Sequence, residues 1–208
     1  MAAPSVNPQE TSPRGAKRRL ESRKRLLGAA RKLFVERGYH ATRPQDITKA
    51  AGLGHGTFYL HFADKRECFL AFVDEAREEV DAAIMDRASA AKDLASLIEG
   101  ALTALYDYSE EHPGLLATAM SDEAVIASGG GTPDKTLLRR WGEEWSELLK
   151  AHAKNAPIAR DYDLPILGQA IVGAIHQASS FAYRSGRSRA ILIKTLTQLI
   201  VRALTPKS

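Results

Sequence analysis

Polar side chains that can bind a nucleic acid alternate with phenylalanines in the short segment 55–62. On a helix, Thr57, Tyr59 and His61 fall on the side away from the two phenylalanines. Their hydroxyl and imidazole groups can donate to phosphates or touch base edges, and the Thr57 methyl can contact thymine. The spacing therefore predicts a short helix that reads DNA.

The residues around this segment favour the same chemistry. Gly56 has no side chain, so the protein backbone can approach a ligand closely at this position. A helix start near Gly54 and His55 presents free N–H groups to a phosphate. Lys65, at the start of the next helix, is placed to neutralise a backbone phosphate. The alternative is that these are ordinary surface residues of a helix pair that does not bind DNA.

Two short helices joined by a glycine turn must position these side chains. Pro44 suits the first position of a helix that runs to Ala51, and the turn 52–54 leads directly into the DNA-reading segment. This order predicts a helix-turn-helix. An earlier helix, entered at residues 17–19, ends at Gly38. We expect a small core in which the pair packs on Leu33 and Phe34 through Ile47, Ala50, Leu53, Phe58 and Phe62.

The charge is divided unevenly along the chain. Residues 1–66 hold 14 Lys and Arg against 5 Asp and Glu, a net +9, whereas residues 67–208 hold 15 against 20, a net −5. A basic end on an acidic body suggests a polyanion partner for that end, the alternative being a solvated basic tail. Residues 1–16 are rich in Pro and Ser and predict a disordered basic arm. Four cations at the end of this arm and directly after it could add phosphate or minor-groove contacts: Arg14, Lys17, Arg18 and Arg19.

The rest of the chain also has helical periodicity, and no segment alternates with the period of a strand. We expect one helix from Asp64 toward Met85. Further helices are expected at Leu94–Glu111, from Leu115, from Pro133 to about Lys154, at Pro165–Tyr183 and at Ser188–Leu204, with a loop at 128–132. The fold class is all-α, with a helix-turn-helix domain at 17–66 and a second helical domain at 67–208.

Composition argues against several other classes. No apolar run approaches the roughly 20 residues that span a bilayer, and the first residues lack the apolar region of a signal peptide, so we expect a cytoplasmic protein. The single cysteine, Cys68, lies among apolar residues and reads as a core thiol, not as part of a disulfide or cysteine metal site.

An enzyme is the main alternative from another class. The six histidines are scattered, no Ser/His/Asp or Cys/His arrangement is visible, and the glycines at 129–131 lack the Lys-Ser/Thr of a phosphate loop. We therefore expect no catalytic residues, no cofactor and no metal.

Over about residues 20–70 the chain resembles the TetR family of repressors. The resemblance is carried by Gly38-Tyr39-His40-Ala41-Thr42, Gln45-Asp46-Ile47, Ala50-Ala51-Gly52-Leu53 and Gly56-Thr57-Phe58-Tyr59-Leu60-His61-Phe62-Ala63-Asp64-Lys65. It implies an all-helical homodimer in which each subunit reads half of a palindromic operator, with repression as the default. It also implies that Thr42 and Lys65 contact phosphates. The residues implied at or near the DNA are Gln45, His55, Thr57, Tyr59 and His61.

Three positions depart from the family pattern. Gly54 replaces the usual Ser or Thr, which removes a side-chain cap at modest cost. His55 replaces a frequent Lys, so the lysine ammonium of the family pattern gives way to an imidazole. Arg43, with the proline that follows it, adds a cation at a helix N-terminus, where it opposes the helix dipole, so we expect a phosphate as its partner.

The second domain is expected to dimerise and to bind a small, largely apolar effector. The last two helices carry broad apolar faces that can form a four-helix interface between subunits; the alternative is burial within one subunit. The candidates for an effector pocket are large, mostly aromatic side chains, a few of them with a polar tip, and the alternative is that they are ordinary core residues: Tyr106, Met120, Trp141, Trp145, His176 and Phe181. The helix after Lys65 would carry the effector's influence to the helix-turn-helix. A helix-turn-helix protein that binds only another protein, with no ligand, is the second alternative.

Overall fold

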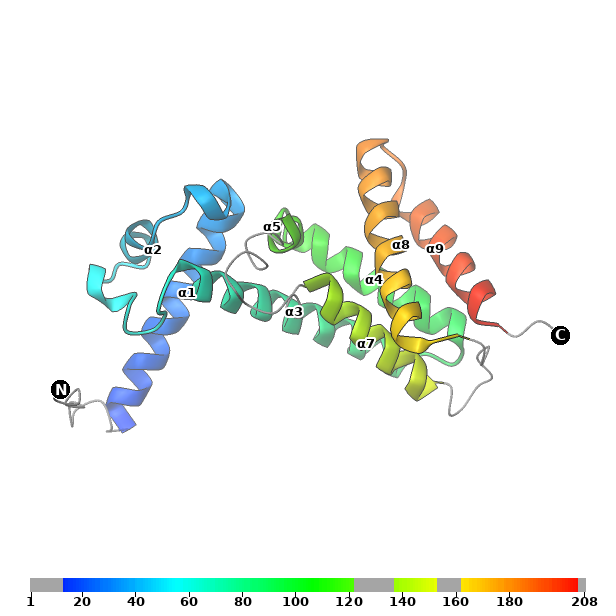
Figure 1. Ribbon diagram of the computed structural model, residues 1–208, viewed down its shortest axis with the longest axis horizontal. Coiled ribbons are helices and arrows are strands. Elements are labelled where there is room, and N and C mark those ends of the chain that lie inside the picture. Colours follow the sequence, from blue (N-terminus) through cyan, green and yellow to red (C-terminus); the bar gives the residue numbers. More distant parts are fainter. Residues whose placement is uncertain (1–12, 122–136, 153–161, 206–208) are drawn as a thin grey trace. The chain divides into compact units, whose positions relative to one another are not determined.

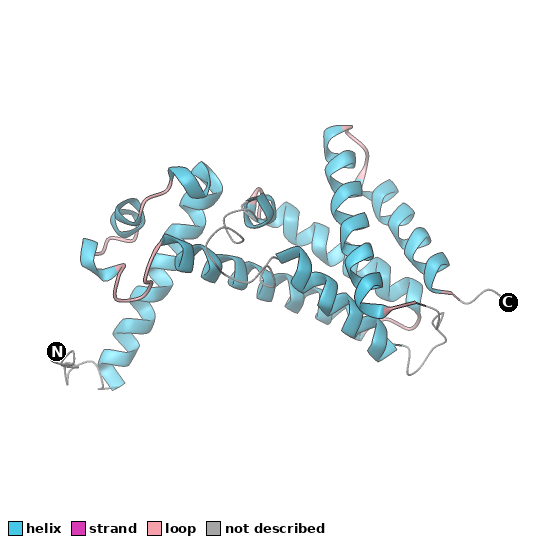
Figure 2. Cartoon of the chain, viewed as in Figure 1, coloured by secondary structure: helices cyan, strands magenta, loops and turns pink. Residues whose placement is uncertain are grey.

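The computed structural model describes residues 13–121, 137–152 and 162–205, and this part of the chain consists of helices, loops and turns without a strand (Figures 1 and 2). The all-α prediction is therefore confirmed. The elements are α1 (Pro13–Ala41), α2 (Pro44–Ala50), the 3₁₀ helix η1 (His55–Thr57), α3 (Lys65–Ser89), α4 (Leu94–Glu111), α5 (Leu115–Ser121), α7 (Leu137–His152), α8 (Leu164–Arg184) and α9 (Arg189–Leu204).

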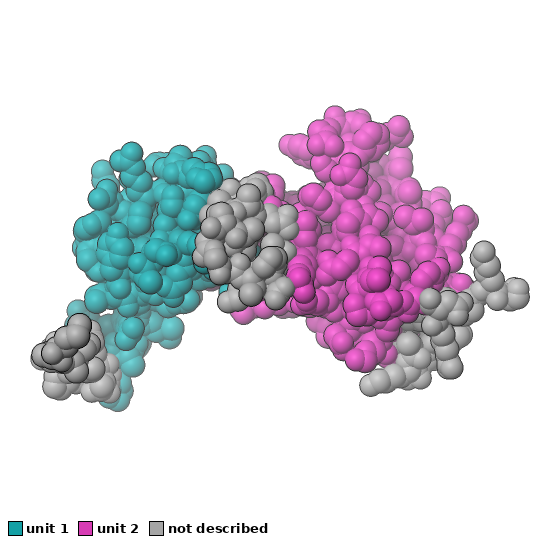
Figure 3. Space-filling model, viewed as in Figure 1, with its two compact units in different colours: residues 1–74 teal, residues 75–208 magenta. Residues whose placement is uncertain are grey.

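The chain forms two compact units, residues 1–74 and 75–208 (Figure 3). The boundary expected from the sequence, after residue 66, falls in the first turn of α3. The first unit extends further because Phe69 and Phe72 pack on Phe34, with ring centroids 5.1 and 5.8 Å apart. The first turns of α3 thus complete the core of the N-terminal unit.

α1 begins earlier than the sequence suggests. Residues 13–16, the end of the predicted disordered arm, are helical; residues 1–12 lie outside the described residues. At the other end Gly38 has φ 77° and ψ 169° and breaks the helix where the sequence predicted its end. A short helical turn follows and ends at Ala41.

The helix pair is present, but its second member is short. α2 matches the prediction to within one residue. The DNA-reading segment, predicted as a helix over 55–62, is η1 followed by a single turn in which the Phe62 N–H donates to the Phe58 carbonyl (3.0 Å). The rings of these two phenylalanines anchor the turn in the core.

The expected core of the first unit forms, with one correction. Leu33, Phe34, Ile47, Phe58 and Phe62 are all buried, and Leu53 is partly exposed. Ala50 is exposed and Ala51 is buried in its place. The reason is that Ala51 follows Ile47 by four residues and shares its face.

Side-chain caps define the helices of the second unit. The Ser96 N–H donates to the Asp93 carboxylate at the start of α4 (2.7 Å), and the Ile166 N–H donates to Asp163 at the start of α8 (3.0 Å). Ser188 caps α9 in the same way. These ends agree with the sequence prediction to within a residue, whereas the expected loop at 128–132 and helix start at Pro133 lie outside the described residues.

Within the second unit, α7 packs along α8, α4 packs along α9, and α8 contacts α9. Ion pairs link α4 to α3 and α9, because the Asp107 carboxylate of α4 accepts from Arg87 of α3 and from Arg189 of α9. The interior is apolar, with Ile98, Leu102, Leu149 and Leu204 fully buried.

Candidate nucleic-acid interface

The turn between α2 and η1 is held by an arginine of α1. The Arg25 guanidinium donates to the carbonyls of Ala51 (2.6 Å) and Gly52 (3.2 Å). Gly52 adopts φ 63°, a left-handed conformation that favours glycine. Arg25 therefore provides a charged donor to two carbonyls of this turn. The two bonds hold α2 and η1 at a fixed angle to each other.

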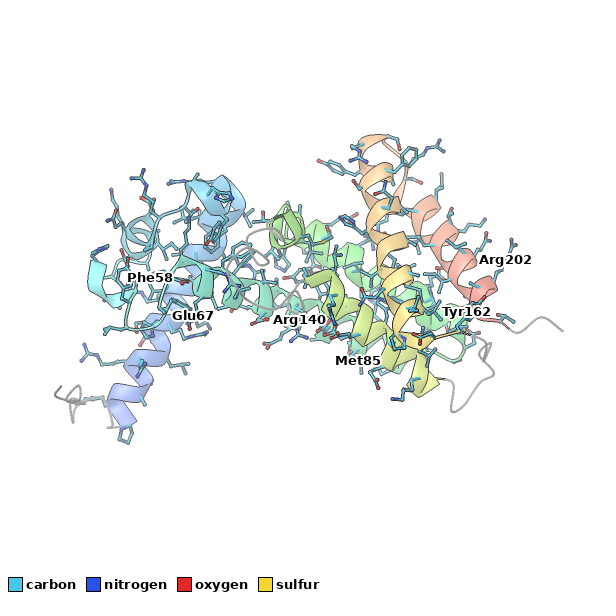
Figure 4. All side chains as sticks on the ribbon, viewed as in Figure 1. Phe58, Glu67, Met85, Arg140, Tyr162 and Arg202 are labelled. Carbon is cyan, nitrogen blue, oxygen red and sulfur yellow. The ribbon has the colours of Figure 1, made fainter. Side chains whose placement is uncertain are left out.

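The recognition segment, which we define as residues 54–62, turns one side to the core and the other to solvent. Phe58, labelled in Figure 4, is fully buried. Tyr59 is 55% exposed, and its ring meets that of His55 edge-on with centroids 6.0 Å apart. Thr57 is partly exposed beside them, and a Cβ added at Gly56 would meet nothing within 4 Å. His55, Thr57 and Tyr59 thus share an exposed surface, and His61 is not part of it.

The far end of the recognition segment is fastened to α1. The Ser22 hydroxyl lies 2.7 Å from His61 Nε2, and Arg19 donates to the Leu60 carbonyl (3.3 Å). The Arg23 guanidinium lies over the Phe62 ring, 5.4 Å from its centroid. Burial and then the charges of Arg19 and Arg23 lower the pKa of His61. His61 is therefore a neutral ring that positions the segment.

Two residues for which the resemblance implies phosphate contacts are engaged inside the unit. Thr42 is fully buried, and its hydroxyl donates to the carbonyls of Gly38 (2.8 Å) and Leu33 (3.3 Å). Lys65 donates to the Tyr39 carbonyl (2.8 Å), and its ammonium lies 4.2 Å from the centroid of the Tyr39 ring. In this structure both side chains stabilise the bend that follows α1.

The start of α2 presents two exposed polar side chains. Arg43 and Gln45 both face solvent. The Arg43 N–H donates to the Asp46 carboxylate (3.2 Å), which supplies a negative charge in the first turn of α2. That carboxylate offsets the unfavourable position of the Arg43 cation at the N-terminus of α2.

The sequence missed the residues that hold this surface in place. The sequence predicts a DNA contact for Arg19 and no contact for Ser22 or Arg25, whereas each of the three bonds to a residue between Ala51 and His61. Their regular spacing of three residues along one side of α1 was the available signal. What a sequence alone cannot supply is the partner, which lies 26 to 41 residues away.

The six candidates for an effector site do not lie in one kind of environment. Trp141 and Trp145 are buried on α7, while Tyr106 and Met120 are partly exposed. The Tyr106 hydroxyl bonds to that of Ser179 (2.6 Å), and Trp141 Nε1 is buried without a hydrogen-bond partner among the described residues. His176 and Phe181 face solvent on α8, and Phe181 is 56% exposed.

Other chemistry finds no support in the described part of the chain. Cys68 is fully buried, and burial raises its pKa to about 12, so the thiol stays protonated as expected of a core residue. Among the described residues no group of three or more His, Cys, Asp or Glu is arranged to hold a metal ion. None of the described helices combines the length and apolarity needed to cross a membrane.

A helix-turn-helix with an exposed polar recognition segment, joined to a second helical unit, defines a DNA-binding transcriptional regulator. Residues 26–72 match the family model described as bacterial regulatory proteins, tetR family. The HTH-type transcriptional regulator LmrA of Bacillus subtilis (strain 168) is 30% identical over 134 residues, which cover 62% of this chain and 70% of that protein. The chain belongs to the TetR family of transcriptional regulators.

Two further comparisons extend over almost the whole chain. YdgC of Bacillus subtilis (strain 168), an HTH-type transcriptional regulator, is 24% identical over 195 residues, 90% of this chain and 95% of that protein. The structure of the fatty acid degradation regulator FadR from Bacillus halodurans matches with a TM-score of 0.70 at 19% identity, covering 95% and 96% of the two chains. The relatives and the fold are those of transcriptional regulators, not of enzymes.

Proposed function

We propose that the protein is a homodimeric repressor that binds a palindromic operator and releases it when a small, largely apolar effector binds the second unit. The observation that carries the DNA-binding part is the exposed side of the recognition segment. His55, Thr57 and Tyr59 share that side, and contacts with α1 hold both the turn that precedes the segment and the far end of the segment. A rigid element that presents polar side chains suits base readout in a major groove.

The proposed contacts divide by position. His55, Thr57 and Tyr59 reach base edges, and the N–H groups at Gly54 and the start of η1 face a phosphate. Arg43 and Gln45, at the start of α2, bind the DNA phosphate backbone beside these base pairs. Thr42, His61 and Lys65 hold these groups in place through their bonds within the unit.

The exposed faces of α8 and α9 support the homodimer. Five large apolar side chains on these two helices are more than half exposed: Ile166, Phe181, Tyr183, Ile191 and Leu199. Other residues of the same helices, including Ile171 and Ile200, are buried within the subunit. Exposed apolar faces of this extent mark association sites, and paired half-sites on DNA need paired subunits.

The buried indole of Trp141 supports an effector that carries a hydrogen-bond acceptor. A buried N–H without a partner is costly, and an acceptor on an otherwise apolar ligand would satisfy it. The Trp145 ring, also on α7, adds apolar surface. The effector would then change the separation of the two recognition segments through α3, which contributes residues to both units. The protein would act in the cytoplasm.

The experiment that tests this function is selection of random duplexes by the purified full-length chain, followed by sequencing. The proposal predicts enrichment of a two-fold symmetric motif whose half-sites lie about one helical turn or a multiple of it apart. Recovery of a motif without symmetry would contradict the dimeric mode of binding. Absence of any enriched sequence would contradict operator binding itself.

A further inference from the structure

The N-terminal helical extension, which we define as residues 13–18 of α1, continues beyond the part of α1 that has a buried side. The first buried residue of α1 is Leu26, and the 13 residues that precede it, from Pro13 to Arg25, span about 20 Å of helix. Figure 1 shows the blue start of α1 running past α2 and the recognition segment. A helix has a fixed direction, unlike the disordered arm that composition predicted.

This part of α1 is strongly basic. Residues 13–25 contain seven Lys and Arg and one acidic residue, Glu21, which leaves a net charge of +6. Within the extension Arg14, Lys17 and Arg18 are all exposed. The first turn of α1 holds no acidic residue, so these cations repel one another and also oppose the helix dipole. A polyanion would relieve both effects.

The last residue of the extension, Arg18, lies directly before the part of α1 to which the recognition segment is attached. Arg19 donates to the Leu60 carbonyl, and Ser22 lies 2.7 Å from His61. Arg14 precedes Arg19 by five residues, about 8 Å along the helix. The basic surface of α1 therefore begins beside the recognition segment and leads outward from it.

We propose that the N-terminal helical extension binds the phosphate backbone of duplex DNA, through Arg14, Lys17 and Arg18, next to the base pairs that the recognition segment reads. The inference rests on the proposed DNA binding and adds a second contact to it. Long cationic side chains on a helix surface bind phosphates without regard to sequence. The contact should therefore raise affinity and salt dependence without changing which sequence is preferred.

The test compares full-length variants on a long mixed-sequence duplex across a range of salt concentrations. Arg14→Gln/Arg18→Gln removes two cations and keeps good helix formers, and Arg14→Lys/Arg18→Lys keeps the charge. Lys92→Gln/Lys150→Gln removes two exposed cations from the second unit. We expect the slope of log affinity against log salt to become shallower by about 1 to 2 in the first variant only.

The outcomes separate the extension from the rest of the interface. An unchanged slope in Arg14→Gln/Arg18→Gln, with clear binding by the unaltered chain, overturns the extension contact and leaves the proposed function standing. An equal loss in Lys92→Gln/Lys150→Gln also overturns it, because net charge alone would then explain the effect. Failure of the unaltered chain to bind any duplex overturns both proposals.

Discussion

Gly142 of α7 and Gly168 of α8 face each other so closely that a methyl group on Gly168 would overlap the Gly142 carbonyl oxygen and lie 3.0 Å from the Ser146 nitrogen. The atoms in the way are backbone, so the helices would have to separate. We predict that Gly168→Ala lowers the free energy of unfolding by about 1–3 kcal/mol, measured by urea denaturation.

Two other glycines provide the comparison for that measurement. A methyl group on Gly142 would meet mainly the end of the Gln169 side chain, which can move, so Gly142→Ala should cost less. Gly28 lies in α1 with nothing within 4 Å of an added Cβ, and Gly28→Ala should be neutral or stabilise by up to about 1 kcal/mol. Equal losses in all three variants would contradict the close helix crossing.

Asp81 should make the stability of the protein depend on pH near neutrality. Arg77 donates to Asp81 (2.8 Å) and to Glu144 (2.6 Å) where α3 and α7 meet. Burial first, and then Glu144, raise the pKa of the Asp81 carboxyl to about 7. Because this pKa exceeds that of the unfolded chain, about 3.9, the folded state binds the proton more tightly. The resulting stabilisation is complete below about pH 4 and is lost as the pH rises through about 7.

We therefore predict that the urea concentration at the unfolding midpoint decreases as the pH rises from about 5 to about 8. Asp81→Asn should remove much of this decrease. Asp86→Asn changes an exposed carboxyl on the same helix and should keep the pH dependence of the unaltered chain. An Asp81→Asn protein with an undiminished pH dependence would show that another group is responsible.

Substitutions at Thr42 test whether this residue of the family signature stabilises the N-terminal unit or contacts the DNA. Its buried hydroxyl donates to two carbonyls, so Thr42→Val should cost about 1–3 kcal/mol of stability. Thr42→Ser keeps the hydroxyl and should stay close to the unaltered chain in both stability and DNA affinity. Weaker DNA binding by Thr42→Val at unchanged stability would favour the phosphate contact instead.

The exposed side of α9 should be needed for dimerisation. Ile191 and Leu199 are 55% and 56% exposed, and Ile191→Glu/Leu199→Glu would place charges in the proposed interface. We predict that this variant sediments as a monomer at concentrations where the unaltered chain is dimeric. Met85→Glu alters an apolar residue of α3 that is 61% exposed (Figure 4) and should leave the dimer intact. A monomeric unaltered chain at all concentrations would contradict the proposed assembly.

The sequence predicted the helices because their signals are local. Pro44 begins α2, Gly38 ends the regular part of α1, and Asp93 and Asp163 cap α4 and α8 within one turn of the residues that they satisfy. Such signals involve neighbours in the chain, so periodicity and turn residues were sufficient. The exposed polar residues of the recognition segment followed from the same periodicity.

The sequence could not predict features set by distant partners. The Lys65 ammonium reaches the Tyr39 carbonyl, 26 residues away, so its position within the unit depends on how α3 returns to α1. Pro13 and Gly15 predict disorder for residues 13–16 of the extension, whereas the strong helix formers from Ala16 onward carry α1 back to Pro13. On α9 one broad apolar face is divided between a buried side with Ile200 and an exposed side with Leu199, which periodicity alone does not separate.

The central claim is that the exposed side of the recognition segment binds DNA, and the most direct test is the affinity of the purified chain for duplex DNA at low and controlled salt. We predict clear binding, with affinity reduced about 10- to 100-fold in His55→Ala or Tyr59→Ala. Tyr162→Ala, which removes an exposed tyrosine of the second unit, should bind as the unaltered chain does. No affinity for any duplex, or equal affinity in all three variants, would contradict the claim.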